Sequence, residues 1–117
     1  MKVKGIHQIS IIVKSQDTVE FYKSTFGFQE VKRIERDNDA VVILKGFGIE
    51  LRLFVDDRHA ARSIPEPLGL RNIGFCVDDI KTACFELGLR DIVKTDWFGQ
   101  RYVVITDPDG NQIQLHE

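Results

Sequence analysis

Glu50 and Arg52 are the residues of this sequence whose types and spacing most clearly permit chemistry. Residues i and i+2 of a strand lie on one face, so their carboxylate and guanidinium groups are expected to be adjacent. In the structural interpretation, which we favour, Arg52 compensates the charge of a buried Glu50. In the functional interpretation, Arg52 binds the carboxylate or phosphate of a ligand. The two interpretations are not exclusive.

Polar side chains on other extended segments accompany this pair. By the same alternation, the faces that carry them also present Gln8, Ser10, Ile12, Phe54, Asn72, Gly74, Cys76, Gln114 and His116. The three amides donate and accept hydrogen bonds without carrying a charge. We therefore expect a neutral surface that binds a polar small molecule. Glu50 is the candidate catalytic residue, because a lone carboxylate can act as a general base.

Trp97 and Arg101 flank a short segment before a predicted strand. They could close over a bound ligand, or Trp97 could instead fill a gap in the core. His116 lies beside the last residue, and the sequence also allows it to be exposed. Cys76 has apolar neighbours and no sequence cue for activation, so its thiol is expected to be a small core side chain.

Four short patterns occur twice in the same order and at nearly constant spacing, which indicates an internal duplication. The pairs are 9–13 with 73–77, 26–28 with 87–89, 41–43 with 103–105, and 49–51 with 113–115. Each copy predicts a β-branched strand, a short amphipathic helix, and three more strands. The later strands are expected at 29–35, 39–45 and 49–55, and again at 92–95, 102–106 and 113–117.

These elements organise the chain as a single domain over 1–117. A first βαβββ module covers 5–55, a linker with prolines and charges covers 56–69, and a second module covers 70–117. A sheet covered by a helix on one face must bury its other face, and the duplicate module is the obvious partner. We predict an α+β fold in which the two modules form a curved half-barrel sheet with the helices outside and a binding cleft inside.

The order of motifs resembles the vicinal oxygen chelate superfamily. It runs from the first strand and its helix through Phe26-Gly27-Phe28 to the terminal Asp107-Pro108-Asp109-Gly110-Asn111-Gln112-Ile113-Gln114-Leu115. That superfamily includes glyoxalase I, extradiol dioxygenases, methylmalonyl-CoA epimerase, fosfomycin-resistance transferases and bleomycin-resistance binding proteins. The resemblance covers the whole chain. It implies the half-barrel fold and assembly as a homodimer.

The resemblance also implies where a metal would bind, since the metal-using members take ligands from the first and last strand of each module. The corresponding residues here are Gln8, Glu50, Asn72 and Gln114. Only Glu50 is a strong ligand, because neutral amides are poor donors for a transition metal. We therefore predict no metal cofactor, with a weak divalent-metal site at Glu50 as the remaining option.

His7 competes with Gln8 for the first ligand position. Holding the family's usual distance to Phe21 would select His7, but that register turns the apolar residues of 9–13 away from the helix. We favour Gln8, which directs His7 away from the cleft. Even with His7 as a ligand, two of the four positions would be amides.

The leading hypothesis is a glyoxalase/bleomycin-resistance-like protein that binds a small polar organic molecule in the cleft. The alternative is a divergent lyase, isomerase or dioxygenase-type enzyme that uses Glu50 as base or holds a weak metal, so whether the protein is an enzyme stays open. A third is a subunit whose main role is protein pairing. The net charge of −2 argues against nucleic acid, and no apolar run is long enough for a membrane helix. Two cysteines without a disulfide framework favour a cytoplasmic location.

Overall fold

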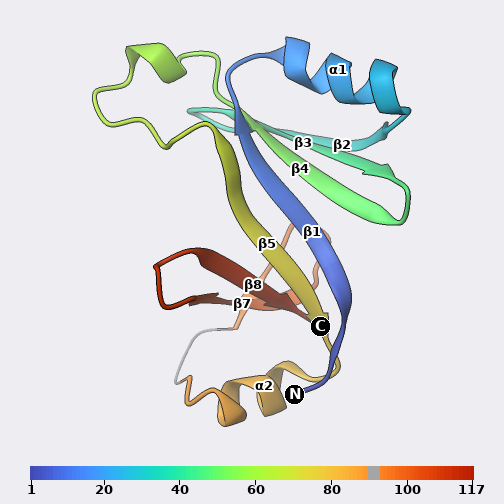
Figure 1. Ribbon diagram of the computed structural model, residues 1–117, viewed down its shortest axis with the longest axis vertical. Coiled ribbons are helices and arrows are strands. Elements are labelled where there is room, and N and C mark those ends of the chain that lie inside the picture. The colour runs from blue at the N-terminus through green and yellow to red at the C-terminus, as the bar shows by residue number, and fades with distance from the viewer. Residues whose placement is uncertain (90–92) are drawn as a thin grey trace. The chain divides into compact units, whose positions relative to one another are not determined.

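The computed structural model describes residues 1–89 and 93–117 and shows an α+β fold (Figure 1). The chain divides into two compact units. The N-terminal unit is Gln8–Arg71, and the C-terminal unit combines Met1–His7 with Asn72–Glu117. The first strand, β1 (Val3–Val13), contributes residues to both units.

The N-terminal unit is a sheet with strand order β2-β3-β4-β1 and one helix. After β1 come α1 (Gln16–Phe26), β2 (Gln29–Glu35), β3 (Ala40–Gly46) and β4 (Ile49–Val55), followed by the short 3₁₀ turn η1 (His59–Ala61). β1 runs parallel to β4, with Ile9 opposite Leu51 and Val13 opposite Val55. β3 lies antiparallel to both β2 and β4.

The C-terminal unit repeats this sequence of elements. Its strand order is β5-β8-β7-β6 beside β1, and its elements are β5 (Gly69–Val77), α2 (Ile80–Glu86), β6 (Lys94–Thr95), β7 (Arg101–Thr106) and β8 (Gln112–His116). The start of β5, up to Arg71, belongs to the N-terminal unit. β5 runs parallel to β8, with Ile73 opposite Ile113. The prediction of two tandem βαβββ modules is confirmed. Part of the strand predicted at 92–95 lies outside the described residues, since Ile92 is not among them.

A hydrophobic core lies between the helix and the sheet of each unit. In the N-terminal unit, Val19 of α1 packs in a buried cluster with Val13, Phe28, Val42, Leu44, Leu51 and Leu53, and Ile9 and Ile11 pack against it. In the C-terminal unit, Ile80 and Ala83 of α2 pack with Val77, Val103 and Leu115. Ile9, Ile11 and Val13 therefore face the helix, as predicted. Every second side chain of a strand lies on the same face.

The helix ends lie at residue types that favour capping. Ser15 precedes α1, and the helix ends at Gly27, whose φ of 84° is a left-handed conformation that suits glycine. Asp79 caps α2 by accepting a hydrogen bond from the Lys81 backbone N–H at 3.1 Å. Among the described residues, no helix is long and apolar enough to cross a membrane.

Candidate functional site

The face of the N-terminal unit opposite α1 carries the first group of predicted site residues. Gln8, Ser10 and Ile12 of β1 are almost completely buried, as are Glu50, Arg52 and Phe54 of β4. In the parallel register Ser10 lies opposite Arg52 and Ile12 lies opposite Phe54. The assignment of these six residues to one face therefore agrees with the geometry of this unit.

Glu50 and Arg52 form a buried ion pair on that face. The Arg52 Nε donates a hydrogen bond to Glu50 Oε2 at 2.5 Å, and the two side chains are only 4% and 9% exposed. Lys45 Nζ lies 4.0 Å from the other carboxylate oxygen of Glu50. The structural interpretation of Arg52 is thus realised, and the ligand-clamp interpretation stays a prediction.

A pocket of about 230 Å³ lies at Ile12 and Phe54 of the same face, still within the N-terminal unit. It is lined by Ile12, Arg36, Asn38, Asp39, Phe54, Asp56, Arg62, Ile64, Glu66 and Arg71. The Arg71 guanidinium lies 4.2 Å from the centroid of the Phe54 ring, and that of Arg36 lies 5.3 Å from it. Two cations therefore share one aromatic ring in this pocket, an arrangement that the ring quadrupole favours.

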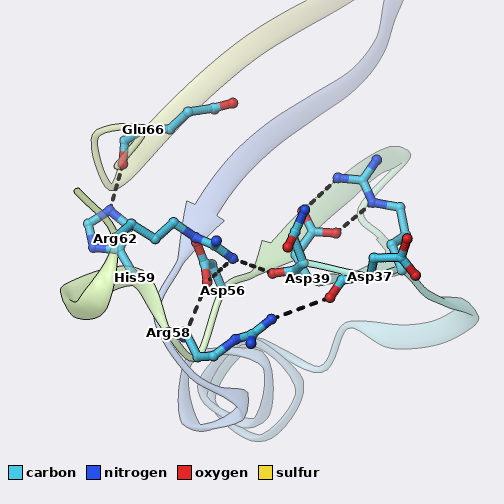
Figure 2. Close-up of polar contacts among 9 residues, drawn as sticks. Asp37, Asp39, Asp56, Arg58, His59, Arg62 and Glu66 are labelled. Atoms are coloured by element: carbon cyan, nitrogen blue, oxygen red, sulfur yellow. Dashed lines mark hydrogen bonds and ion pairs between the residues drawn. The ribbon is translucent and has the colours of Figure 1, made fainter. Parts of the chain in front are cut away.

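A network of ion pairs fixes the walls of the pocket (Figure 2). Arg36 binds both carboxylate oxygens of Asp39, at 2.5 and 2.6 Å. Arg62 binds Asp56 at 2.5 and 2.9 Å and also donates to the Asn38 carbonyl at 2.6 Å. The hydrogen bond from Arg62 holds the pKa of Asp56 below its usual value, because it stabilises the charged carboxylate.

The segment after η1 is tied to this network. His59 Nε2 lies 2.6 Å from the Glu66 carbonyl oxygen, and the Glu66 carboxylate lies 3.3 Å from Arg71 Nε. The sequence described 56–69 only as a linker. In the structure its side chains build one side of the pocket, which local patterns could not show because the segment also contacts residues distant in sequence, such as Asn38, whose carbonyl accepts from Arg62.

The face of the C-terminal unit opposite α2 carries the second group of predicted site residues. Asn72 is 5% exposed, Cys76 is half-buried, and Gln114 Oε1 lies 2.8 Å from His116 Nε2. His116 itself is completely buried, with Tyr102 stacked on its ring at 5.1 Å between centroids. The expectation that His116 could be exposed is wrong, because β8 is an inner strand of this unit and its last residue lies directly opposite Tyr102.

His7 also lies in the C-terminal unit and corrects a second expectation. Its ring stacks on His116 with the centroids 3.8 Å apart and the planes within 5°. The prediction that His7 points away from the site residues is therefore wrong for this unit. The reason is that its face was assigned from the alternation of 9–13, which packs in the N-terminal unit, whereas Met1–His7 packs in the other.

Trp97 lies between β6 and β7, and Arg101 is the first residue of β7. Trp97 is 36% exposed, so it does not fill a gap in the core. Arg101 binds both carboxylate oxygens of Glu117 at 2.6 Å on the surface. This contact raises the pKa of Arg101 and lowers that of Glu117. A role for either residue in ligand binding stays a prediction.

The family model described as Glyoxalase/Bleomycin resistance protein/Dioxygenase superfamily matches residues 5–115, which is almost the whole chain. The chain belongs to this superfamily. A relative in Escherichia coli (strain K12), the uncharacterized protein YaeR, is 33% identical to this chain over 126 residues. The match covers 98% of this chain and 97% of YaeR.

Solved structures of superfamily members share the fold. Methylmalonyl-CoA epimerase from Mycobacterium tuberculosis superposes with a TM-score of 0.77 at 19% identity, covering 98% of this chain and 88% of the epimerase. A Streptomyces coelicolor methylmalonyl-CoA epimerase variant in complex with 2-nitronate-propionyl-CoA gives 0.74 at 20% identity, covering 98% and 97%. At these identities the likeness concerns the fold alone.

The metal that the superfamily implies does not fit the residues at its four expected positions. Gln8, Asn72 and Gln114 are amides, and Glu50, the one carboxylate, already binds Arg52 at 2.5 Å. A divalent transition metal needs several anionic or imidazole ligands, and this donor set offers only the Glu50 carboxylate. We derive no chemistry through a metal at these positions.

Proposed function

We propose that this superfamily member binds a small organic acid in the pocket at Phe54. The observation that carries the proposal is the placement of the Arg71 and Arg36 guanidinium groups over one aromatic ring, 4.2 and 5.3 Å from its centroid. Guanidinium groups bind carboxylates through charge-assisted hydrogen bonds, and the ring beside them offers an apolar surface for the rest of the ligand.

The pocket separates polar and apolar contacts in the way that such a ligand needs. Ile12 and Phe54 are only 6% and 5% exposed and form an apolar floor, while Ile64 is 91% exposed at the rim. A hydrocarbon body that packs against Ile64 would remove the apolar surface of that side chain from water. The volume of about 230 Å³ is below the range of roughly 300–1,000 Å³ typical of drug-sized ligands, so a small metabolite fits best.

The ion pair between Arg71 and Glu66 is the contact that a bound ligand would replace. Its atoms are 3.3 Å apart, and the side chains are 30% and 57% exposed, so the pair contributes little to stability. A ligand carboxylate can take the place of the Glu66 carboxylate at small cost. By contrast, Arg36 and Arg62 are held by two hydrogen bonds each to Asp39 and Asp56 and keep the walls in place.

The alternative of an enzyme that uses Glu50 as base has weaker support. Arg52 already donates a hydrogen bond to the Glu50 carboxylate, so Oε2 of this carboxylate is occupied by Arg52 rather than open to a substrate. The binding hypothesis requires no proton transfer from this buried pair. It therefore agrees better with the contacts that the N-terminal unit makes.

The test is a binding screen of small mono- and dicarboxylates by saturation-transfer NMR, followed by calorimetry on the best acid. Arg71→Gln should weaken binding by roughly 10-fold to 100-fold, because a hydrogen bond to a charged group contributes about 1.5–3 kcal/mol. Arg33→Gln is the matched control, since it removes the same charge from β2 without lining this pocket.

Two further outcomes decide the proposal. The uncharged amide of the best acid should bind much more weakly than the acid itself. The proposal is abandoned if no carboxylate binds, or if Arg71→Gln and Arg33→Gln reduce affinity equally, because binding would then reflect overall charge.

A further inference from the structure

We infer that His7, Asp96 and His116 form a binding site for a divalent transition-metal ion within the C-terminal unit. One potential ligand atom from each of these three residues lies within 4.8 Å of the other two. Two imidazoles and one carboxylate are a ligand set that zinc and other imidazole-binding divalent metals use, with further positions left for water or substrate. Asp96 and His116 differ from all four positions at which superfamily resemblance places a metal, and His7 was only the alternative to Gln8 at the first of them.

Three separate parts of the unit supply these residues. His7 comes from β1 and His116 from the end of β8, while Asp96 follows β6 in the turn that leads to β7. His116 is completely buried and the Asp96 side chain is 3% exposed, whereas His7 is half-buried. The site therefore has two enclosed ligands and one nearer the surface, through which an ion could enter.

The turn fixes the Asp96 carboxylate in a defined orientation. Its Oδ1 accepts hydrogen bonds from the backbone N–H groups of Phe98 and Gln100, both at 2.9 Å. Its Oδ2 faces His116, 3.7 Å from Nδ1. One oxygen thus holds the turn together, and the other is presented to the imidazole.

Two glutamines select the tautomer of both histidines. Gln100 Oε1 lies 2.7 Å from His7 Nε2, and Gln114 Oε1 lies 2.8 Å from His116 Nε2. An amide oxygen only accepts hydrogen bonds, so both Nε2 atoms carry the hydrogen when the imidazoles are neutral. The lone pair is then on Nδ1 of each ring. Histidines that bind a metal usually donate the N–H of their other ring nitrogen to such an acceptor, which fixes the orientation of the ring.

With this tautomer, the contact between His116 Nδ1 and Asp96 Oδ2 favours a cation between the two atoms. A neutral Nδ1 and a carboxylate oxygen are both electron-rich, and a cation between them removes their repulsion. Their separation of 3.7 Å is too long for a hydrogen bond. Metal bonds of about 2.0–2.2 Å place neighbouring ligand atoms of a tetrahedral ion roughly 3.4 Å apart. The observed spacing thus needs only a small contraction.

One rearrangement accompanies binding. The rings of His7 and His116 are parallel within 5° and their centroids are 3.8 Å apart, so their lone pairs do not converge on one point. His116 is held between Tyr102 and His7, whereas His7 is nearer the surface. The His7 ring is therefore the one that turns, and metal binding should end the stacking.

The experiment is calorimetric titration of Zn²⁺ and Co²⁺ into the untagged full-length chain, with one ion expected per chain. Asp96→Asn and His7→Gln should each reduce metal affinity by more than about 100-fold. Removing a group that only hydrogen-bonds to a metal ligand costs roughly 10-fold to 100-fold, and these variants remove a ligand itself. Asp96→Asn retains Oδ1, so the turn should survive. His116→Gln is avoided as the main test because its burial makes misfolding a competing explanation.

The chain contains three histidines, so the third supplies the matched control. His59→Gln should leave affinity unchanged, since this residue belongs to the N-terminal unit. Long-range ¹H–¹⁵N NMR should show Zn²⁺ shifting Nδ1 of His7 and His116 but not of His59. Absence of stoichiometric binding overturns the inference, as does binding that Asp96→Asn leaves intact or that His59→Gln abolishes. Failure here leaves the organic-acid proposal unaffected, because its residues lie in the other unit.

Discussion

Arg52 Nε and Glu50 Oε2 are 2.5 Å apart on one face of β4, with both residues less than a tenth exposed. The pair occupies the position where superfamily resemblance places a metal-binding carboxylate. In this protein the positive charge beside that carboxylate comes from the guanidinium group of Arg52, two residues further along the same strand.

Separating this pair should destabilise the N-terminal unit. Glu50→Gln leaves the Arg52 charge buried without its carboxylate, so we expect a loss of about 3–5 kcal/mol in the free energy of unfolding. The double variant Glu50→Leu with Arg52→Met replaces both charges by apolar groups and should recover most of the loss. Urea unfolding of the three proteins provides the measurement. Additive losses in the double variant would show that the two residues are not coupled.

Gly46 should not tolerate a larger side chain, because the Phe28 ring packs directly on it. A Cβ at Gly46 would lie 2.8 Å from Phe28 Cδ1, and Phe28 is 8% exposed in the core. Gly46→Ala is expected to cost about 1–3 kcal/mol, as overpacking in cores does. Chemical denaturation measures this cost. If the clash is its cause, the same substitution in a Phe28→Leu background should cost clearly less.

Gly27 should be required by the backbone at the end of α1 rather than by packing. Its φ is 84°, and a Cβ there would meet no atom within 4 Å. Gly27→Ala should therefore cost about 1–2 kcal/mol through the left-handed conformation alone. Asparagine adopts this conformation more readily, so Gly27→Asn should lose less. Thermal unfolding of both variants is the measurement, and equal losses would contradict the conformational explanation.

Stability should fall in acid partly through Asp56. The Arg62 hydrogen bond lowers the pKa of Asp56 in the folded protein below its unfolded value of about 3.9. The resulting stabilisation is fully present above the unfolded pKa and is lost as the pH falls through the folded one. Asp56→Asn should therefore be less stable than wild type at neutral pH and lose less stability below about pH 4.

Urea midpoints measured from neutral to acidic pH would show this convergence of the two curves. Asp57→Asn is the control, because the exposed neighbour makes no such pair with Arg62. Parallel curves for wild type and Asp56→Asn would show that the carboxylate of Asp56 does not contribute to acid unfolding.

The sequence alone determined the βαβββ order and the helix-facing residues, because both follow from local periodicity. Ile9 and Leu51 each lie between two polar neighbours, and Gly27 ends a helix by its own conformational freedom. The same local reasoning placed Gln8 with Glu50 and Arg52 on one face and showed that most of the expected metal ligands are amides. Each of these inferences spans only a few residues along one strand or helix.

Only the tertiary structure decided which distant residues meet. Asp96 and His7 carried no sequence signal as partners of His116, because their convergence depends on a turn and on β1 being shared between two units. The pocket at Phe54 likewise depends on Arg71 and Glu66, which lie beyond the local pattern of β4. Alternation determines the face of a strand on which a side chain lies. Which residues from other strands and turns contact that side chain depends on the packing of the folded chain.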